Sequence, residues 1–389
     1  MKKLFLILTI LFMYAPLSYA QQQAPLNDVS GEGDFLQDVV LDAPQREQQS
    51  VSRMAAPLAA DSVTKTFYIN FDGDVINTGN WNYGETPITM LAPDINFSAK
   101  QGIVARVQEL YSPYDVVVTT SRDVYLAAPA TARQQCDVVK YNATLWGTPA
   151  GGVSYINSMS WGDDTPCFVF ADLLGNGVKK VGDATAHEFG HAGGALGHDS
   201  IIGTVDGSCA VVGNYKASVG SGPLSWGSLM GNSYAGSVVT FVSNATPYCD
   251  SFLDQMTVLA TTLGTKADDF GDSFASAAPI DGRAPYIKTL VMNSNSDVDM
   301  FAITSDVPRY LTLSSRGTTD FKVTLYDASH AQLTVLNPTN TLSIPRTDIS
   351  SYVAQPGTLY LSIQRSNDDP NTYVPTTSGD GSAILNITH

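Results

Sequence analysis

The sequence predicts an α/β (α+β) domain with a mostly parallel twisted sheet, followed by an all-β sandwich domain. Two observations lead to this fold class. Between residues 63 and 265, short β-branched and aromatic runs alternate with helical patterns, which favours a layer of strands covered by helices. From residue 266 to 389, short strands recur at regular spacing with turn residues between them, as in an antiparallel sandwich.

The elements of the first domain are predicted from their hydrophobic periods. Residues 98–111 have apolar side chains at 103, 104, 107 and 110, which is a helical period. The short, glycine-flanked segment 152–156 suits an edge strand. The remaining expected elements are strands at 65–71, 115–120, 136–141 and 166–171, a helix over 180–193, and a last helix over 248–263 after a long connection.

The second domain begins after the acidic, turn-rich segment 268–272. Its predicted strands are short and separated by turn signals. They are expected at 286–292, 298–304, 310–314, 321–326, 332–336, 358–363 and 383–387.

Three of the five histidines fall in one short window, which predicts a metal site. His187 and His191 are four residues apart, so a helix places them on one face, where both imidazoles can reach one zinc ion. Glu188 is free to take a proton from a water molecule activated by the metal and to pass it to a leaving amine. We therefore expect a zinc site with Glu188 as the general base.

The third ligand requires the chain to turn after the helix. Gly193, Gly194 and Gly197 would allow this turn, because glycine enters left-handed conformations readily. His198 is then the expected third ligand, and three protein ligands plus water form an open, catalytic zinc site. An HExxH sequence also arises by chance on ordinary helices, so the glycine turn and His198 provide the context that favours metal binding.

The window from His187 to Asp199 resembles the metzincin clan of zinc peptidases, and its His198-Asp199 ending resembles the reprolysin-type branch. The resemblance implies zinc ligation by His187, His191 and His198, with Met230 in the turn beneath the imidazoles. The chain departs from the pattern at one point, because three residues instead of two separate Gly194 from His198.

This resemblance implies a secreted zinc endopeptidase whose substrate strand pairs antiparallel with the edge strand at 152–156. Tyr234, four residues after Met230, is a candidate oxyanion stabiliser, with packing against a wall of the site as the simpler alternative. Two other functions stay open. One is an exported, non-catalytic adhesion or binding protein, and the other is a zinc amidase that acts on cell-wall peptides.

The second domain resembles the bacterial pre-peptidase C-terminal domain, through the segments Ser296–Phe301 and Val323–Asp327. Asp297 and Asp299 could bind calcium through their oxygen atoms. Solvation or hydrogen bonding at the start of a strand is the alternative for both aspartates.

Residues 1–20 are predicted to be a signal peptide, with Lys2 and Lys3 before an apolar run and Ser18-Tyr19-Ala20 at the cleavage position. Residues 21–62 form a pro-segment or flexible leader without cysteine, in which Asp34 could cap the zinc. We expect a secreted or extracellular protein, with the periplasm as the other location. Without the signal lysines, 19 basic residues face 37 acidic ones, a net charge near −18. This excess argues against nucleic acid and anionic membranes as partners. We expect a protein or peptide substrate and a monomeric chain.

The four cysteines predict two disulfides in an exported chain. We expect the pairs Cys136–Cys167 and Cys209–Cys249, because each pair stays within one local region. Buried free thiols are the alternative.

Overall fold

The computed structural model describes residues 39–41, 63–77, 79–82, 86–205, 208–221, 225–242, 255–282, 285–294, 296–315, 321–336, 349–354, 356–365 and 381–388. The signal peptide, Asp34, Cys249, the side chain of Cys209 and most of the leader lie outside these residues, so the Cys209–Cys249 pairing stays a prediction. Within the described residues, no helix has the length and apolar character needed to cross a membrane.

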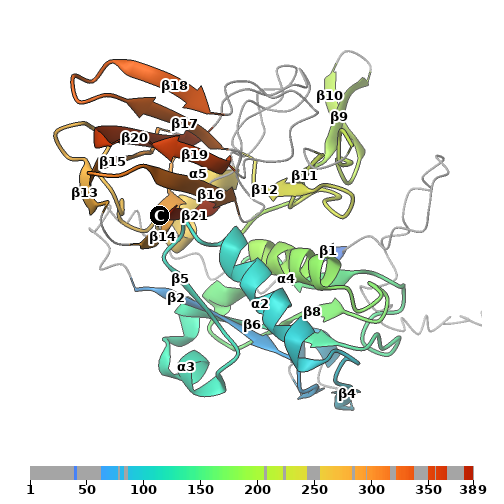
Figure 1. The fold of residues 1–389 in the computed structure, drawn as a ribbon. Coiled ribbons are helices and arrows are strands. Elements are labelled where there is room, and N and C mark those ends of the chain that lie inside the picture. Colours follow the sequence, from blue (N-terminus) through green and yellow to red (C-terminus); the bar gives the residue numbers. More distant parts are fainter. Residues whose placement is uncertain are drawn as a thin grey trace, which may run out of the picture. The chain divides into compact units, whose positions relative to one another are not determined.

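A six-stranded sheet carries the first part of the fold (Figure 1). Its pairings are parallel except that β7 runs antiparallel to β8, so the sheet is mixed and the expected mostly parallel sheet is corrected. The strand order is β1 (Val39–Leu41), β7 (Gly152–Tyr155), β8 (Cys167–Phe170), β6 (Arg133–Val139), β2 (Lys65–Asn70) and β5 (Val116–Thr119).

The segment expected at the edge of the sheet is not an edge strand. β7 pairs with β8 on one side and, in parallel, with β1 of the leader on the other side, with Val40 opposite Ser154. A local hydrophobic pattern cannot reveal this pairing, because the two partners are more than a hundred residues apart in the chain.

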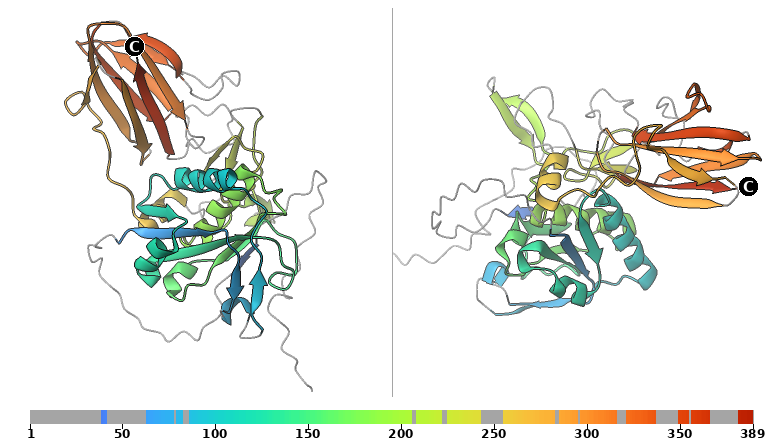
Figure 2. Two further views of the ribbon diagram at one scale, coloured as in Figure 1. Left: turned by 60° about the horizontal axis from the view of Figure 1, so that its bottom comes forward. Right: turned by 90° about the vertical axis from the view of Figure 1, so that its left-hand side faces the viewer.

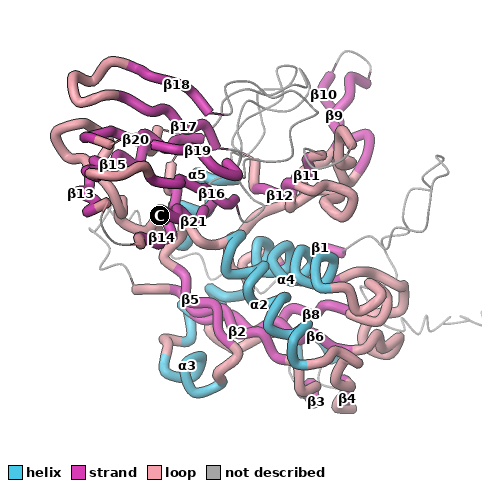
Figure 3. The backbone as a smooth tube through the Cα atoms, in the orientation of Figure 1, coloured by secondary structure: helices cyan, strands magenta, loops and turns pink. Residues whose placement is uncertain are grey.

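Helices cover both faces of the sheet because neighbouring side chains of a strand point to opposite sides. Phe67 of β2 stacks on Phe189 of α4 (Val178–Ala192) with ring centroids 4.4 Å apart. The next residue, Tyr68, contacts Tyr125 of α3 (Arg122–Ala127) on the other face. α2 (Phe97–Leu110) packs beside α4 (Figure 3). The hydroxyl of Tyr111, which follows α2, donates to the carbonyl of Ala186.

The remaining described elements of this part are short. They are α1 (Gly79–Asn82), the antiparallel pairs β3 (Asp74–Ile76) with β4 (Ile88–Met90) and β9 (Ile201–Val205) with β10 (Ser208–Gly213), the parallel pair β11 (Trp226–Ser228) with β12 (Val238–Thr240), 3₁₀ turns at Ala130–Ala132 and Ser158–Trp161, and α5 (Gln255–Leu263).

The predicted all-β region is confirmed, and its two sheets share one hydrophobic core (Figure 2). Leu290 and Leu385 come to this core from one sheet, and Phe301 and Leu361 come from the other. The first sheet has the order β13 (Ala278–Asp281), β15 (Val298–Ser305), β20 (Gly357–Arg365), β17 (Phe321–Tyr326) and β18 (Gln332–Leu336), and the second has the order β14 (Tyr286–Met292), β21 (Gly381–Thr388), β16 (Arg309–Ser315) and β19 (Ile349–Ala354).

The predicted Cys136–Cys167 disulfide is absent, and both residues are buried free thiols. They lie opposite one another on the parallel strands β6 and β8. Side chains opposite each other in this way project side by side, and adjacent strands are about 4.8 Å apart, whereas a disulfide needs its Cβ atoms about 3.8 Å apart. Proximity in sequence therefore predicted that the two cysteines are neighbours, but the disulfide bond between them was a wrong prediction.

Candidate metal centre

The structure brings the three histidines of the sequence motif together. His187 and His191 lie one turn apart on α4, and His198 follows the helix. A ring nitrogen from each of the three lies within 4.8 Å of those of the other two. The side chains of His187 and His191 are almost fully buried, and that of His198 is half-buried.

Two backbone carbonyls fix the orientation of the helical imidazoles. Nδ1 of His187 lies 2.6 Å from the carbonyl oxygen of Leu229, and Nδ1 of His191 lies 2.7 Å from that of Leu196. A carbonyl oxygen only accepts, so each Nδ1 must be the donor. In the neutral imidazole this leaves a lone pair on each Nε2, the arrangement that metal-ligating histidines show when a second group holds their other nitrogen.

The opposed Nε2 atoms fit a shared cation. Nε2 of His187 and Nε2 of His191 are 2.8 Å apart, and both carry lone pairs when the two Nδ1 atoms donate. Nε2 of His198 is buried with no hydrogen-bond partner. Burial, followed by the neighbouring His187, lowers the pKa of His198 to about 3, and burial also holds the pKa of His191 well below its usual value. Three imidazole nitrogens of this kind suit zinc.

The turn after the helix differs from the expected one. The left-handed residue is Ala195, with φ of 57°, and not one of the glycines. Gly193 and Gly194 are needed for space instead. A Cβ atom on Gly193 would lie 2.6 Å from the ring of Phe67, and one on Gly194 would lie 2.6 Å from Leu259. This tight turn places the Leu196 carbonyl against His191.

The segment of Met230 supports the histidines from the other side. Met230 is fully buried, and its sulfur lies 2.7 Å from where a Cβ atom on Gly190 would be. Leu229 supplies the carbonyl that holds His187, and the carbonyl of Met230 accepts from the backbone N–H of Asp199 at 2.8 Å. The same turn therefore holds both the helix and the segment that follows His198.

Glu188 is buried on α4 beside β7. A Cβ atom on Gly152 of β7 would collide with its carboxylate, and the Cδ atom of Glu188 would be only 2.8 Å away. The hydroxyl of Ser154 donates to the backbone carbonyl of Glu188 at 3.3 Å, and the N–H of Asn157 donates to that of His191 at 2.9 Å. Glycine at position 152 thus provides the space in which the carboxylate lies.

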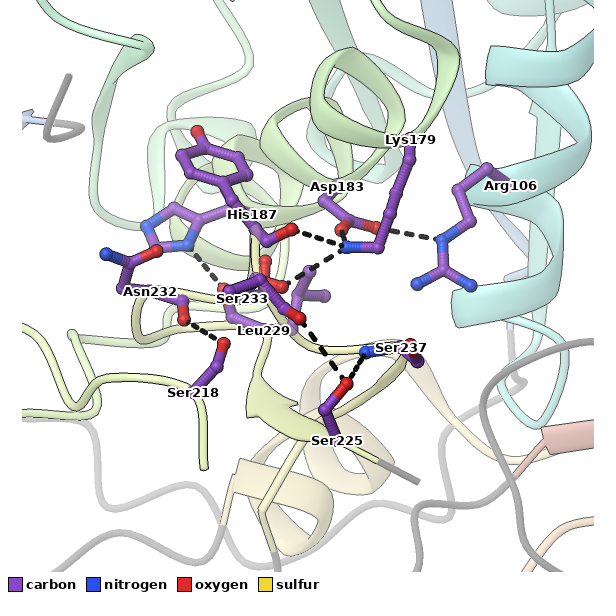
Figure 4. A network of polar contacts seen from close by, with 12 residues as sticks. Arg106, Lys179, Asp183, His187, Ser218, Ser225, Leu229, Asn232, Ser233 and Ser237 are labelled. Carbon is purple, nitrogen blue, oxygen red and sulfur yellow. Dashed lines mark hydrogen bonds and ion pairs between the residues drawn. The ribbon is translucent and has the colours of Figure 1, made fainter. Parts of the chain in front are cut away.

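An ion network that the sequence did not reveal ties α2, α4 and the chain after Met230 together (Figure 4). The fully buried carboxylate of Asp183 accepts from Arg106 at 2.8 Å and from Lys179 at 2.6 Å. Lys179 also donates to the carbonyl of Ser233 at 3.2 Å. The Asp183–Lys179 spacing of four is a helical signal, but Arg106 comes from another helix and no sequence pattern points to it.

Two tyrosines lie in this region, and only Tyr234 was predicted from the sequence. The ring centroid of Tyr215 lies 4.3 Å from that of His198. No sequence pattern indicated this contact, because Tyr215 lies beyond the β9–β10 pair. Tyr234 packs against the hydrophobic core that includes Phe189 and Met230, and the ammonium of Lys180 lies 6.0 Å from its ring centroid. Its role as an oxyanion stabiliser stays a prediction.

No protein-family profile and no curated protein sequence matches the chain. Among solved structures, the pre-peptidase C-terminal domain of a collagenase from Bacillus anthracis is similar at 11% identity with a TM-score of 0.22, covering 31% of this chain and 100% of that chain. The periplasmic g-type lysozyme inhibitor PliG of Aeromonas hydrophila is similar at 6% identity and a TM-score of 0.19, covering 29% of this chain and 96% of that one. Scores this low leave function to be argued from the site.

Proposed function

We propose that this chain is a zinc-dependent endopeptidase that uses Glu188 as its general base. The observation that carries the proposal is the set of three converging imidazoles, of which the two on α4 are held through Nδ1 by backbone carbonyls. His187, His191 and His198 would hold the ion. Three histidines leave a fourth position for water or substrate, which is the ligand set of a catalytic zinc site and not of a structural one.

Each part of the site has a role in peptide hydrolysis. When bound, zinc polarises the scissile carbonyl and lowers the pKa of the attacking water. Glu188 lies next to the first ligand, takes the proton of that water and returns it to the leaving nitrogen. The burial of Glu188 keeps bulk water from competing for its carboxylate.

Strand β7 is the surface on which an extended substrate would lie, because β7 also lines the Glu188 carboxylate through Gly152. In the structure β1 pairs with β7 in the parallel direction. A substrate strand and β1 would therefore compete for the same backbone groups. We infer that the leader opposes substrate binding and that its removal frees β7.

The test of this function compares wild type with Glu188→Gln, which keeps the volume of the side chain. We expect both proteins to hold one zinc ion, measured by metal analysis, and the variant to lose about 10²–10⁴-fold in cleavage rate on an unfolded protein such as casein. Asp123→Asn, an exposed position on α3, serves as the matched control and should cleave at the wild-type rate.

Two outcomes would contradict the proposal. One is a purified wild type that takes up no zinc, and the other is a Glu188→Gln variant that cleaves at the wild-type rate. Cleavage of cell-wall peptides in place of casein would instead favour the amidase. Zinc affinity that His198→Ala leaves unchanged would assign the third ligand to another group.

A further inference from the structure

Five aspartates come together at the start of the β-sandwich. Asp268, Asp269 and Asp272 lie in the segment before β13, and Asp297 and Asp299 lie at the beginning of β15. Carboxylate oxygens of Asp268, Asp269 and Asp299 lie within 4.8 Å of one another, and so do those of Asp268, Asp272 and Asp297. The two triads overlap because Asp268 belongs to both.

The surroundings of Asp299 are unfavourable for an isolated negative charge. Its side chain is fully buried, and neither of its carboxylate oxygens has a hydrogen-bond partner. Oδ2 of Asp297 accepts from the N–H of Asn293 at 2.7 Å, whereas its buried Oδ1 has no such partner. Among the described residues, no salt bridge involves any of the five aspartates. A buried carboxylate without a partner is strongly unfavourable, so this one needs a proton or a cation.

The backbone holds the carboxylates close together. The N–H of Met300 donates to the carbonyl of Gly271 at 3.1 Å, and the ring of Phe270 lies 4.7 Å from that of Phe301, centroid to centroid. These contacts fasten the 268–272 segment to β15. The aspartates therefore cannot move apart to relieve their repulsion. Burial, together with the charges of Asp269 and Asp297, raises the pKa of Asp299 to about 9, as expected for a carboxylate that lacks its counterion.

We propose that the two overlapping triads form a calcium site that fastens the first segment of the sandwich to β15. All the ligand atoms are oxygens, which suits a hard cation and disfavours zinc. A cage with this many carboxylates favours calcium over magnesium, because calcium accepts six to eight irregularly placed oxygens, whereas magnesium keeps several waters in a strict octahedron. Asp268, shared and exposed, is the ligand common to both triads.

Calcium titration of the full chain by calorimetry, after removal of divalent ions on a chelating resin, tests the site. We expect saturable binding with Kd of about 10⁻⁴–10⁻³ M or tighter, and a rise of several degrees in melting temperature when calcium is added. Asp268→Asn should weaken calcium binding at least about tenfold, because even groups that only support a ligand cost that much when removed. Asp281→Asn, an exposed aspartate of β13 outside the triads, is the control and should bind as wild type does.

Asp299→Asn provides a second readout. It should lose the calcium-induced rise in melting temperature while its melting temperature without calcium is no lower than that of wild type, because the substitution removes a buried, unpaired charge. The site is overturned if wild type shows no saturable calcium binding, if Asp268→Asn and Asp299→Asn both bind as wild type does, or if magnesium binds as tightly. Zinc content, measured in the same samples, should be unchanged in both variants, so failure here is distinguishable from failure of the proposed peptidase site.

Discussion

The sulfur of Met230 lies 2.7 Å from the position that a Cβ atom on Gly190 would occupy, so the helix carrying His187 and His191 rests directly on this side chain. The contact is possible only because residue 190 has no side chain. The turn around Met230 also supplies the carbonyl that holds His187. Helix position and imidazole orientation therefore depend on the same turn.

Gly190→Ala should displace Met230 and destabilise the fold by about 1–3 kcal/mol, the usual cost of overpacking a core. Its zinc affinity should fall as well, because the Leu229 carbonyl moves with the turn. Thermal unfolding and a competitive zinc assay measure the two effects. Gly197→Ala is the control, since nothing lies within 4 Å of its new Cβ atom. Equal stability of the two variants would contradict the packing argument.

Gly152→Ala should reduce peptide cleavage while zinc content stays at the wild-type level. The new methyl group would occupy the space of the Glu188 carboxylate, and the three atoms nearest to it all belong to Glu188. We expect the loss to fall on kcat, since the base and not the metal is displaced. Gly147→Ala is the control and should keep its activity, because no atom lies within 4 Å of a Cβ atom at position 147. If Gly152→Ala retains full kcat, Glu188 does not act from this position.

Ala195→Gly should stabilise the protein. A left-handed conformation costs a residue with a Cβ atom about 1–2 kcal/mol, and glycine avoids this cost but loses more chain entropy on folding. The net gain is therefore up to about 1.5 kcal/mol, measured by chemical denaturation. A loss of stability would show that Ala195 does not hold this conformation in solution.

Asp183→Ala should destabilise the fold by about 3–5 kcal/mol, because it leaves the partly buried Arg106 and Lys179 without their shared carboxylate. The matched comparison is Asp94→Ala, which removes an ion pair of Lys140 at an exposed carboxylate and should cost no more than about 1 kcal/mol. Denaturant unfolding of both variants measures the difference. Similar values would mean that the network contributes no more than a surface pair.

Replacing both Val40 and Leu41 by proline in the leader should raise kcat/KM. Proline lacks the N–H that a paired strand donates, so β1 should leave β7 and free its backbone groups for a substrate. Two neighbouring positions are changed because the backbone N–H groups of a strand point alternately to its two sides, so one of the two prolines removes an N–H that faces β7. The same pair of substitutions at Gln48 and Gln49, outside β1, is the control. Unchanged kinetics would exclude competition between β1 and the substrate.

Much of the fold follows from local sequence. The helical period predicted 98–111 and 180–193, and the helices span Phe97–Leu110 and Val178–Ala192. The β-branched run at 65–71 became β2 over Lys65–Asn70. The predictions that were wrong concern contacts between segments that are distant in the chain. The β1–β7 pairing, the antiparallel direction of β7 and the reduced Cys136–Cys167 pair are set by the assembled sheet, which no local window contains.

In the candidate site, too, local spacing predicted some residues, and residues from other elements were missed. The spacing of His187, Glu188 and His191 was sufficient to place them on one helix, and the later His198 joins them despite its unusual spacing. Tyr215 and Arg106 were missed because they reach the site region from other elements. Glycine was expected to supply backbone freedom in the turn, but it supplies space there, and Ala195 takes the left-handed conformation.

The groups that orient His187 and His191 are main-chain oxygens of Leu229 and Leu196, and every amino acid has such an oxygen. Replacing either leucine leaves its carbonyl in place, so the effect of a substitution comes from the apolar packing of these two buried side chains. Homologues could exchange either leucine for another apolar residue of similar size without losing the orientation of the ligands. Keeping this orientation depends on the path of the chain, so insertions or deletions in the two turns should be more damaging to the site than an exchange of either leucine side chain.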